Sequence, residues 1–199
     1  MDINKVELLE KISIENKGIL KTADAVQAGV SRTYFLEYVK KNGYEKLDRG
    51  IYLSSDAWED GMYVLQTKYK NTIFSHETAL YLLNLADREP LQYTVTVKHG
   101  YNPRNIVAQG AKVYTVKDDW YSLGIIETES PMGHKVRVYN AERTICDILR
   151  KQYQIEVQER QVALKGYVRK ADRNLPQLME YAELFKVDKV LRYYLEVLL

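Results

Sequence analysis

The chain has 199 residues, 46% of them hydrophobic, and its 29 lysines and arginines nearly balance 27 aspartates and glutamates. This length and hydrophobic content suffice for one large domain or two small ones, while the single cysteine excludes a disulfide framework and any multi-cysteine metal site. The net charge of +2 is far from the strongly basic balance usual for nucleic-acid-binding proteins.

The N-terminal part has a helical pattern that changes to strand character at residue 44. Apolar residues recur at helical spacing, and the segments stop at glycines, which predicts three helices ending at Gly18, Gly29 and Gly43. Side chains able to cap a helix precede the second and the third of them, namely Thr22 and Ser31. Residues 44–53 are expected to form a hairpin around a tight turn at residues 48–50.

The remainder of the chain mixes strands and helices. A helix is predicted over residues 72–85, capped by Ser75. Strand-like runs follow at residues 91–98, 112–116, 122–127 and 135–139. Helical patterns then occupy residues 141–150, 157–168, 175–185 and 189–198. We therefore expect an α+β protein with an N-terminal domain over residues 1–53, a connecting segment over 54–70, and a larger α+β domain over 71–199 whose C-terminal part is helical.

Residues 21–36 contain the arrangement that a helix-turn-helix requires. The small side chain of Ala25 lets two helices cross closely, and Gly29 adopts the turn without a Cβ clash. The second helix then presents its N-terminal residues to the major groove of DNA, and the hairpin after it has the position of a wing. The sequence thus predicts a winged helix-turn-helix at the N-terminus.

The cations of this segment are concentrated on the second helix and the hairpin. Five of the nine basic residues within residues 1–53 lie there, whereas five of the eight acids precede them. The predicted DNA-binding residues are Ser31, Arg32, Thr33, Tyr34, Lys40, Lys41, Lys46 and Arg49. Two acids on the same surface, Glu37 and Glu45, count against this interpretation. The alternative is a three-helix domain that only packs against another part of the protein.

A second basic stretch lies near the C-terminus. Residues 150–199 hold ten basic and seven acidic side chains, and the cluster comprises Arg160, Lys165, Arg169, Lys170 and Arg173. Lys165 and Arg169 share one helix face because they are four residues apart. The stretch is either a solvated helix face or a second surface for nucleic acid or a partner.

No catalytic pattern stands out. The three histidines, His76, His99 and His134, are widely spaced, and Cys146 lies among apolar helix residues, as a core residue does. There is no glycine-rich phosphate loop. Acidic pairs occur at Asp87 and Glu89 and at Glu127 and Glu129 without the further residues of a nuclease or nucleotidyltransferase. We therefore expect no enzyme, no cofactor and no metal. We also expect a cytoplasmic protein, because no apolar run reaches the ~18–20 residues of a membrane span and no signal peptide is evident.

Three blocks in the larger part resemble a known family when they are combined with the N-terminal pattern. They are Phe74–Leu83 (FSHETALYLL), Pro131–Tyr139 (PMGHKVRVY) and Ala141–Arg150 (AERTICDILR). Together they resemble the AbiEi family of abortive-infection proteins, the antitoxins of type IV toxin–antitoxin systems. Structural roles explain the residues of these blocks without any catalytic function. Ser75 is expected to cap a helix, and Ala79, Leu80 and Leu83 are expected to pack in a core. Arg143 is expected to pair with Asp147 one turn later.

The resemblance implies a transcriptional autorepressor that binds inverted repeats in its own promoter through Ser31–Lys41 as recognition helix and Tyr44–Leu53 as wing. It also implies that the larger domain counteracts a nucleotidyltransferase-like toxin without a stable complex. If the antitoxic surface is basic, the residues to expect there are Lys165, Arg169, Lys170 and Arg173. The resemblance is compatible with a monomer in solution and several copies on DNA. Either a preformed dimer or two monomers that meet on DNA fill an inverted repeat.

Two other functions remain open from the sequence. One is a winged-helix transcription factor with a ligand-sensing C-terminal domain and no toxin partner. The other is an interaction protein or an enzyme that binds no promoter DNA.

Overall fold

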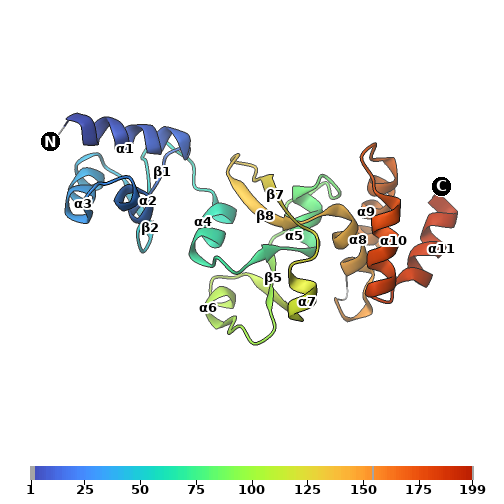
Figure 1. Ribbon diagram of the computed structural model, residues 1–199. Coiled ribbons are helices and arrows are strands. Elements are labelled where there is room, and N and C mark those ends of the chain that lie inside the picture. Colours follow the sequence, from blue (N-terminus) through green and yellow to red (C-terminus); the bar gives the residue numbers. More distant parts are fainter. Residues whose placement is uncertain (1–2, 154, 199) are drawn as a thin grey trace. The chain divides into compact units, whose positions relative to one another are not determined.

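The computed structural model describes residues 3–153 and 155–198 and has an α+β fold, as the sequence predicts (Figure 1). It divides into two compact units. The first comprises Met1–Leu65 together with Pro131–His134, and the second comprises Gln66–Ser130 together with Lys135–Leu199. The division falls inside helix α4 (Gly61–Lys68), a helix that the sequence analysis did not predict.

The first unit combines three helices with a small antiparallel sheet. Its elements are α1 (Ile3–Glu15), β1 (Ile19–Lys21), α2 (Thr22–Gln27), α3 (Arg32–Lys41), β2 (Glu45–Asp48) and β3 (Ile51–Leu53). The sheet order is β1-β3-β2. The three helices and the hairpin are confirmed, but strand β1 was missed because three residues are too few to show a period of two. Helix α2 begins at Thr22 itself, so the capping position belongs to Lys21 and not to Thr22.

The second unit is built on a mixed five-stranded sheet of order β6-β5-β4-β8-β7. Its strands are β4 (Ile73–Phe74), β5 (Thr94–Lys98), β6 (Lys112–Val116), β7 (Ile125–Glu129) and β8 (Lys135–Tyr139). Two neighbouring pairs, β5 with β6 and β4 with β8, are parallel, and the other pairs are antiparallel. The two predicted strands at 112–116 and 135–139 have the observed bounds, whereas β5 starts three residues later than predicted, at Thr94.

The predicted helix over residues 72–85 is wrong at its beginning. Ile73 and Phe74 form β4, and helix α5 (His76–Leu82) starts only after Ser75. Ser75 occupies the capping position, but its hydroxyl does not cap the helix. It lies instead 3.0 Å from Nδ1 of His76 and accepts a hydrogen bond from the hydroxyl of Thr96 at 2.9 Å. These two buried partners, which are visible only in three dimensions, replace the local cap.

The remaining helices of the second unit are α6 (Arg104–Val107), α7 (Asp118–Tyr121), α8 (Ala141–Leu149), a 3₁₀ turn (Lys151–Tyr153), α9 (Val157–Arg169), α10 (Leu175–Leu184) and α11 (Asp188–Leu198). The four long C-terminal helices were predicted to within two residues. Figure 1 shows α8 to α11 gathered together, and α8 contacts α9, α10 and α11. Within the described residues, no helix combines the length and the hydropathy needed to cross a bilayer.

Helix α8 is the centre of the larger core. All nine of its residues are buried, including the four polar ones, Glu142, Arg143, Thr144 and Asp147. Its apolar residues pack in one cluster with α9, α10 and α11, and this cluster includes Cys146, as predicted. Burial raises the pKa of the Cys146 thiol, so the thiol stays protonated and unreactive.

The predicted pair of Arg143 and Asp147 is present and entirely buried. The guanidinium Nε donates to Oδ2 of Asp147 at 2.7 Å, and Nη1 donates to the carbonyl of Trp120 at 2.7 Å. The rings of Tyr139 and Phe185 lie 4.5 and 4.3 Å from the guanidinium carbon. Burying a charge is costly unless it is paired and hydrogen-bonded. Residues of β8, α7, α8 and the end of α10 supply such contacts, although Nη2 of Arg143 has no hydrogen-bond partner among the described residues.

Glu142, the neighbour of Arg143, has a structural role as well. Its Oε1 accepts hydrogen bonds from the hydroxyl of Tyr167 at 2.9 Å and from the backbone N–H of Asn174 at 3.1 Å. Glu142 thereby connects α8 to α9 and to the start of α10. The acidic and basic residues of this block therefore hold helices together.

We expect the Asp147→Asn variant to lower the free energy of unfolding of the second unit by about 3–5 kcal/mol, because it leaves a buried guanidinium without its counter-ion. Denaturation by urea, followed by Trp120 fluorescence in a Trp58→Phe background, measures this. Asp118→Asn, which removes the exposed pair with Lys98 (3.9 Å) within the same unit, is the matched control and should cost less than ~0.5 kcal/mol. Equal losses in the two variants would contradict this role.

His76 gives the second unit a pH-dependent stability. Burial lowers the pKa of His76 from 6.5 to about 4, and its ring lies between Tyr114 and Tyr153, with centroids 4.3 Å away in both cases. Between these two pKa values the unfolded chain binds a proton that the folded chain does not, so stability falls as the pH drops from 6.5 towards 4.

The expected loss over this range is roughly 3 kcal/mol, measured with the same fluorescence assay at pH 7 and pH 4.5. A His76→Phe variant should show a shallower dependence, whereas His99→Gln, a change at an exposed histidine, should not differ from the parent. If His76→Phe leaves the dependence of the unfolding free energy on pH unaltered, other titratable groups cause that dependence.

Candidate nucleic-acid interface

The turn between α2 and α3 has the geometry that the sequence predicts. Ala25 is completely buried, and its carbonyl accepts a hydrogen bond from the N–H of Val30 at 2.9 Å. Gly29 has a φ of +87°, in the left-handed region, and a Cβ there would meet nothing within 4 Å. The glycine is therefore required by its backbone conformation and not by lack of space.

Helix α3 is fixed at its start and along one face. The hydroxyl of Ser31 accepts a hydrogen bond from the N–H of Tyr34 at 3.4 Å, which confirms Ser31 as the N-cap. Phe35, Tyr38 and Val39 are buried in the core of the first unit. The ring of Phe35 also meets that of Tyr52 edge-on at 5.5 Å, which connects α3 to β3. A helix anchored in this way presents its opposite face in a fixed orientation.

That opposite face contains most of the predicted contact residues on α3. Its exposed side chains are Arg32, Thr33, Leu36, Glu37, Lys40 and Lys41. Tyr34 differs from the other predicted residues, because it is half-buried and its ring lies 5.5 Å from the ammonium of Lys5. Leu36 was not predicted, although its spacing of three from Thr33 and four from Lys40 places it on the same face. The carboxylate of Glu37 repels phosphate but can accept a hydrogen bond from a cytosine amino group.

The hairpin presents the other two predicted cations. Lys46 on β2 and Arg49 in the turn are both exposed. The backbone N–H of Arg49 donates to Oδ1 of Asp48 at 2.6 Å, and the carbonyl of Gly50 accepts from the N–H of Thr22 at 2.9 Å. The turn is thus joined to the beginning of α2, so the hairpin and the two helices form one rigid surface.

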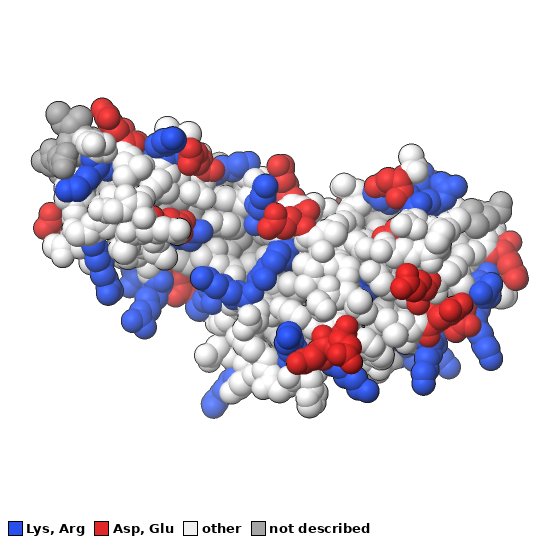
Figure 2. All heavy atoms as spheres, in the orientation of Figure 1, with Lys and Arg blue, Asp and Glu red and all other residues white. Residues whose placement is uncertain are grey.

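The five predicted cations of this surface have no carboxylate partner among the described residues. Lys21, by contrast, lies 3.0 Å from Asp24 and donates to the hydroxyl of Tyr63 at 2.8 Å. Burial works to lower the pKa of Lys21, but these two hydrogen bonds outweigh it and raise the pKa. Figure 2 shows several basic side chains projecting from the first unit in the region of α3 and β2. Unpaired, exposed cations are suited to phosphate because no internal ion pair has to break.

The basic residues of the second unit lie along α9 and the turn after it. Lys165 and Arg169 are exposed and four residues apart, and with Val168 and Leu198 they line a hollow of about 160 Å³. Lys170 is half-buried and lies 3.7 Å from Asp172, while Arg173 donates to the carbonyl of Lys170 at 2.9 Å. Arg160 is half-buried as well, so Lys165, Arg169 and Arg173 are the more accessible members of this set.

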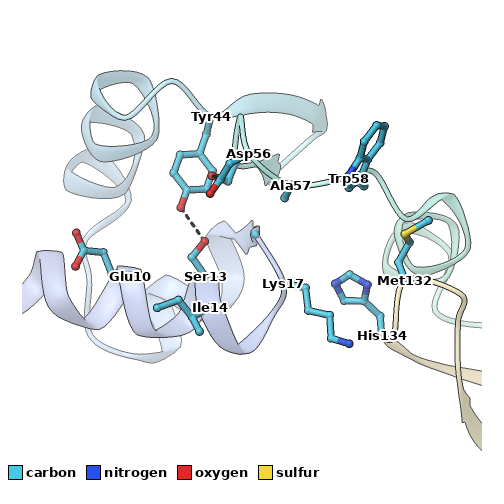
Figure 3. Close-up of a pocket in the computed structure, with 12 residues that line it drawn as sticks. Glu10, Ser13, Ile14, Lys17, Tyr44, Asp56, Ala57, Trp58, Met132 and His134 are labelled. Carbon is cyan, nitrogen blue, oxygen red and sulfur yellow. Dashed lines mark hydrogen bonds between the residues drawn. The ribbon is translucent and has the colours of Figure 1, made fainter.

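A hollow of about 570 Å³ in the first unit is lined by residues from α1, from the segment after β3, and from the turn at Pro131–His134 (Figure 3). Its lining includes the exposed side chains of Ile14 and Trp58. The hydroxyls of Ser13 and Tyr44 are hydrogen-bonded at 2.8 Å on one side of it.

His134, which also lines this hollow, is occupied by structural contacts. Its Nδ1 lies 2.7 Å from Oδ2 of Asp60, its Nε2 lies 3.1 Å from the carbonyl oxygen of Asn16, and its ring stacks on Tyr63 at 4.3 Å. Because both ring nitrogens are engaged, the imidazole has no lone pair directed at a substrate. We therefore assign His134 a structural role, which its wide spacing from the other histidines also favours.

Comparison with known proteins supports the resemblance found in the sequence. Residues 7–55 match the family of transcriptional regulators described as AbiEi antitoxin, and this range extends from α1 to the end of β3. The fold is similar to that of the RV2827C protein from Mycobacterium tuberculosis, with a TM-score of 0.57 and 11% sequence identity, over 96% of this chain and 79% of that one. No curated protein matches the sequence significantly.

Proposed function

We propose that the first unit, whose residues 7–55 match the AbiEi antitoxin family of transcriptional regulators, is a winged helix-turn-helix that binds operator DNA. The proposal rests on one coincidence: the matched segment, residues 7–55, is the segment that presents five exposed cations without carboxylate partners among the described residues.

The two parts of the surface have different roles in this proposal. Arg32 and Thr33 enter the major groove at the start of α3, where helix N–H groups also favour a phosphate. Tyr34 reaches the DNA only from the edge of the helix, since it is half-buried. Lys40, Lys41, Lys46 and Arg49 hold the phosphates and fix the position of α3, while base edges provide the specificity. Ser31 contributes through its cap and its exposed N–H.

The regulatory part of the proposal is supported by the family match of residues 7–55. The chain represses its own promoter by binding inverted repeats, and it acts as the antitoxin of a type IV abortive-infection system in the cytoplasm. The second unit counteracts a nucleotidyltransferase-like toxin without forming a stable complex. Its exposed cations on and after α9, Lys165, Arg169 and Arg173, form the antitoxic surface, and Lys170 supports the turn.

The ligand-sensing alternative needs a pocket in the second unit. A hollow of about 610 Å³ lies beside α5 and α9, but its lining includes the carboxylates of Glu77, Asp87, Glu89, Glu156 and Glu159. Sites for metabolites are usually lined mainly by apolar side chains. The apolar side chains of Leu80, Leu91 and Val162 line this hollow as well, so it is the place at which the ligand-sensing alternative would be tested.

The Lys46→Ala/Arg49→Ala variant tests the wing. We expect weaker binding to every DNA sequence, and a plot of log K against log salt that is shallower by about 0.9 for each lost phosphate contact. Fluorescence anisotropy with the chain's own upstream region, at several salt concentrations, gives both quantities. Lys135→Ala/Lys151→Ala, which removes the same charge from exposed positions of the second unit, should leave the slope unchanged. An unchanged slope in the first variant would remove the hairpin from the interface.

The Lys165→Ala/Arg169→Ala/Arg173→Ala variant tests the antitoxic surface. It should weaken rescue of cells that express the toxin encoded beside this gene, while operator binding remains at the parental level. A variant with alanine at Lys98, Lys135 and Lys151 loses the same charge and serves as control. Full rescue by the first variant, at equal protein levels in an immunoblot, would place the antitoxic surface elsewhere.

A further inference from the structure

Helix α11 presents an apolar stripe to the solvent. Val190 is 38% exposed, Tyr193 is 69% exposed and Val197 is 73% exposed. Their spacing of three and four residues places them on one face. The opposite face is engaged with the core, since Leu191 is fully buried and Leu195 and Leu198 pack against the main cluster. Single exposed apolar residues are ordinary, but a continuous row on a helix indicates a contact with another helix.

A row of charges follows the same helix beside the stripe. Lys189, Arg192 and Glu196 each precede a stripe residue by one position, so they form a parallel line on the flank. The basic residues are in the first half of α11 and the acid is in the second half. Among the described residues, the carboxylate near Arg192 is that of Glu183, which lies 4.0 Å away, and both side chains are mostly exposed.

This pattern is complementary to itself when two copies of α11 lie antiparallel. A two-fold axis near residues 193 and 194 places Val190 of one copy opposite Val197 of the other, and brings the two Tyr193 rings together at the centre. The same register places Arg192 of each copy beside Glu196 of the other. The apolar stripe and the two Arg192–Glu196 pairs are thus satisfied by a single register. A parallel two-fold pair would instead place the charged rows of the two copies on opposite flanks, where Arg192 and Glu196 cannot pair.

We propose that α11 is the surface through which two copies of this chain contact each other when they occupy adjacent half-sites on DNA; the inference rests on the proposed operator binding. Helix α11 has 11 residues, so it is about 16 Å long and its footprint is roughly 200 Å² per copy. A stable complex buries about 800 Å² per partner. The copies therefore remain monomers in dilute solution and pair only where DNA holds them at high effective concentration.

Charge reversal at the proposed contact tests the pairing. Arg192→Glu and Glu196→Arg each create two like-charge pairs across the two-fold axis, so each variant should bind a two-half-site operator with about tenfold less cooperativity. An equimolar mixture of the two variants restores both unlike pairs in every mixed complex. Because half of the possible arrangements on two half-sites are mixed, the cooperativity of the mixture should recover to about half of the parental value or more.

The controls separate this contact from other effects. Affinity for a single half-site should be parental in both variants, which shows that folding and DNA recognition are intact. Lys151→Glu makes the same change of charge as Arg192→Glu but outside α11, and it should leave cooperativity unchanged. Recovery in the mixture cannot arise within one chain, since neither variant carries both substitutions. If the mixture stays as poor as the single variants, or if the single variants retain full cooperativity, the pairing of α11 is wrong.

A second readout needs no operator, so it distinguishes failure of this inference from failure of the proposed function. The native thiol, Cys146, is buried, which leaves an introduced cysteine as the reactive one. At high protein concentration under mild oxidation, Tyr193→Cys should form a disulfide-linked dimer faster than Gln161→Cys, an exposed position on α9. Equal rates would overturn the pairing even if operator binding is intact. If Arg192→Glu and Glu196→Arg lose toxin rescue but keep full cooperativity, the apolar stripe contacts a different protein and the proposed pairing is wrong.

Discussion

The buried guanidinium of Arg143 is the interaction on which the larger unit depends. It cannot remain in a low-dielectric interior without a counter-ion, so Asp147 must stay one turn away. The rings of Tyr139 and Phe185 and the carbonyl of Trp120 must surround it. These partners come from β8, α7, α8 and the end of α10. One charge thus fixes how the sheet and the helices of this unit pack.

This use of polar residues explains where functional surfaces are to be expected. Glu142, Arg143 and Asp147 are all consumed by internal contacts, and His76 and His134 are engaged by neighbouring rings and hydrogen bonds. The outer face of α3 with its hairpin, the basic side of α9 and the row on α11 are accessible and lie outside these internal contacts. All three are faces of helices or hairpins whose other side is anchored in a core. An anchored face of this kind holds its exposed side chains in a fixed arrangement, which suits recognition of a macromolecular partner.

The small net charge has a physical meaning in this context. Non-specific DNA binding grows with the number of phosphates neutralised, and a chain of charge +2 limits that number. The cations on α3 and the hairpin remain available to phosphate, because they have no carboxylate partner among the described residues. Lys21 and Lys112, by contrast, each form an ion pair with a carboxylate. With weak general affinity, the proposed binding to operator DNA would depend more strongly on base contacts and on cooperation between copies.

The sequence by itself determined the helices with clear periodicity, the turn at Gly29, the cap at Ser31 and the exposed cations, because each depends on residues within about one helical turn. It also predicted that Arg143 and Asp147 pair, which is a local i,i+4 relation. Only the tertiary structure decided that Ile73 and Phe74 form a strand, since two residues show no period and their pairing partners, β5 and β8, are distant in sequence. The tertiary structure also decided the burial of His76 and the side of α11 that remains exposed. The sequence of an amphipathic helix shows which residues are apolar, but the packing of neighbouring elements decides how much of that apolar surface is covered.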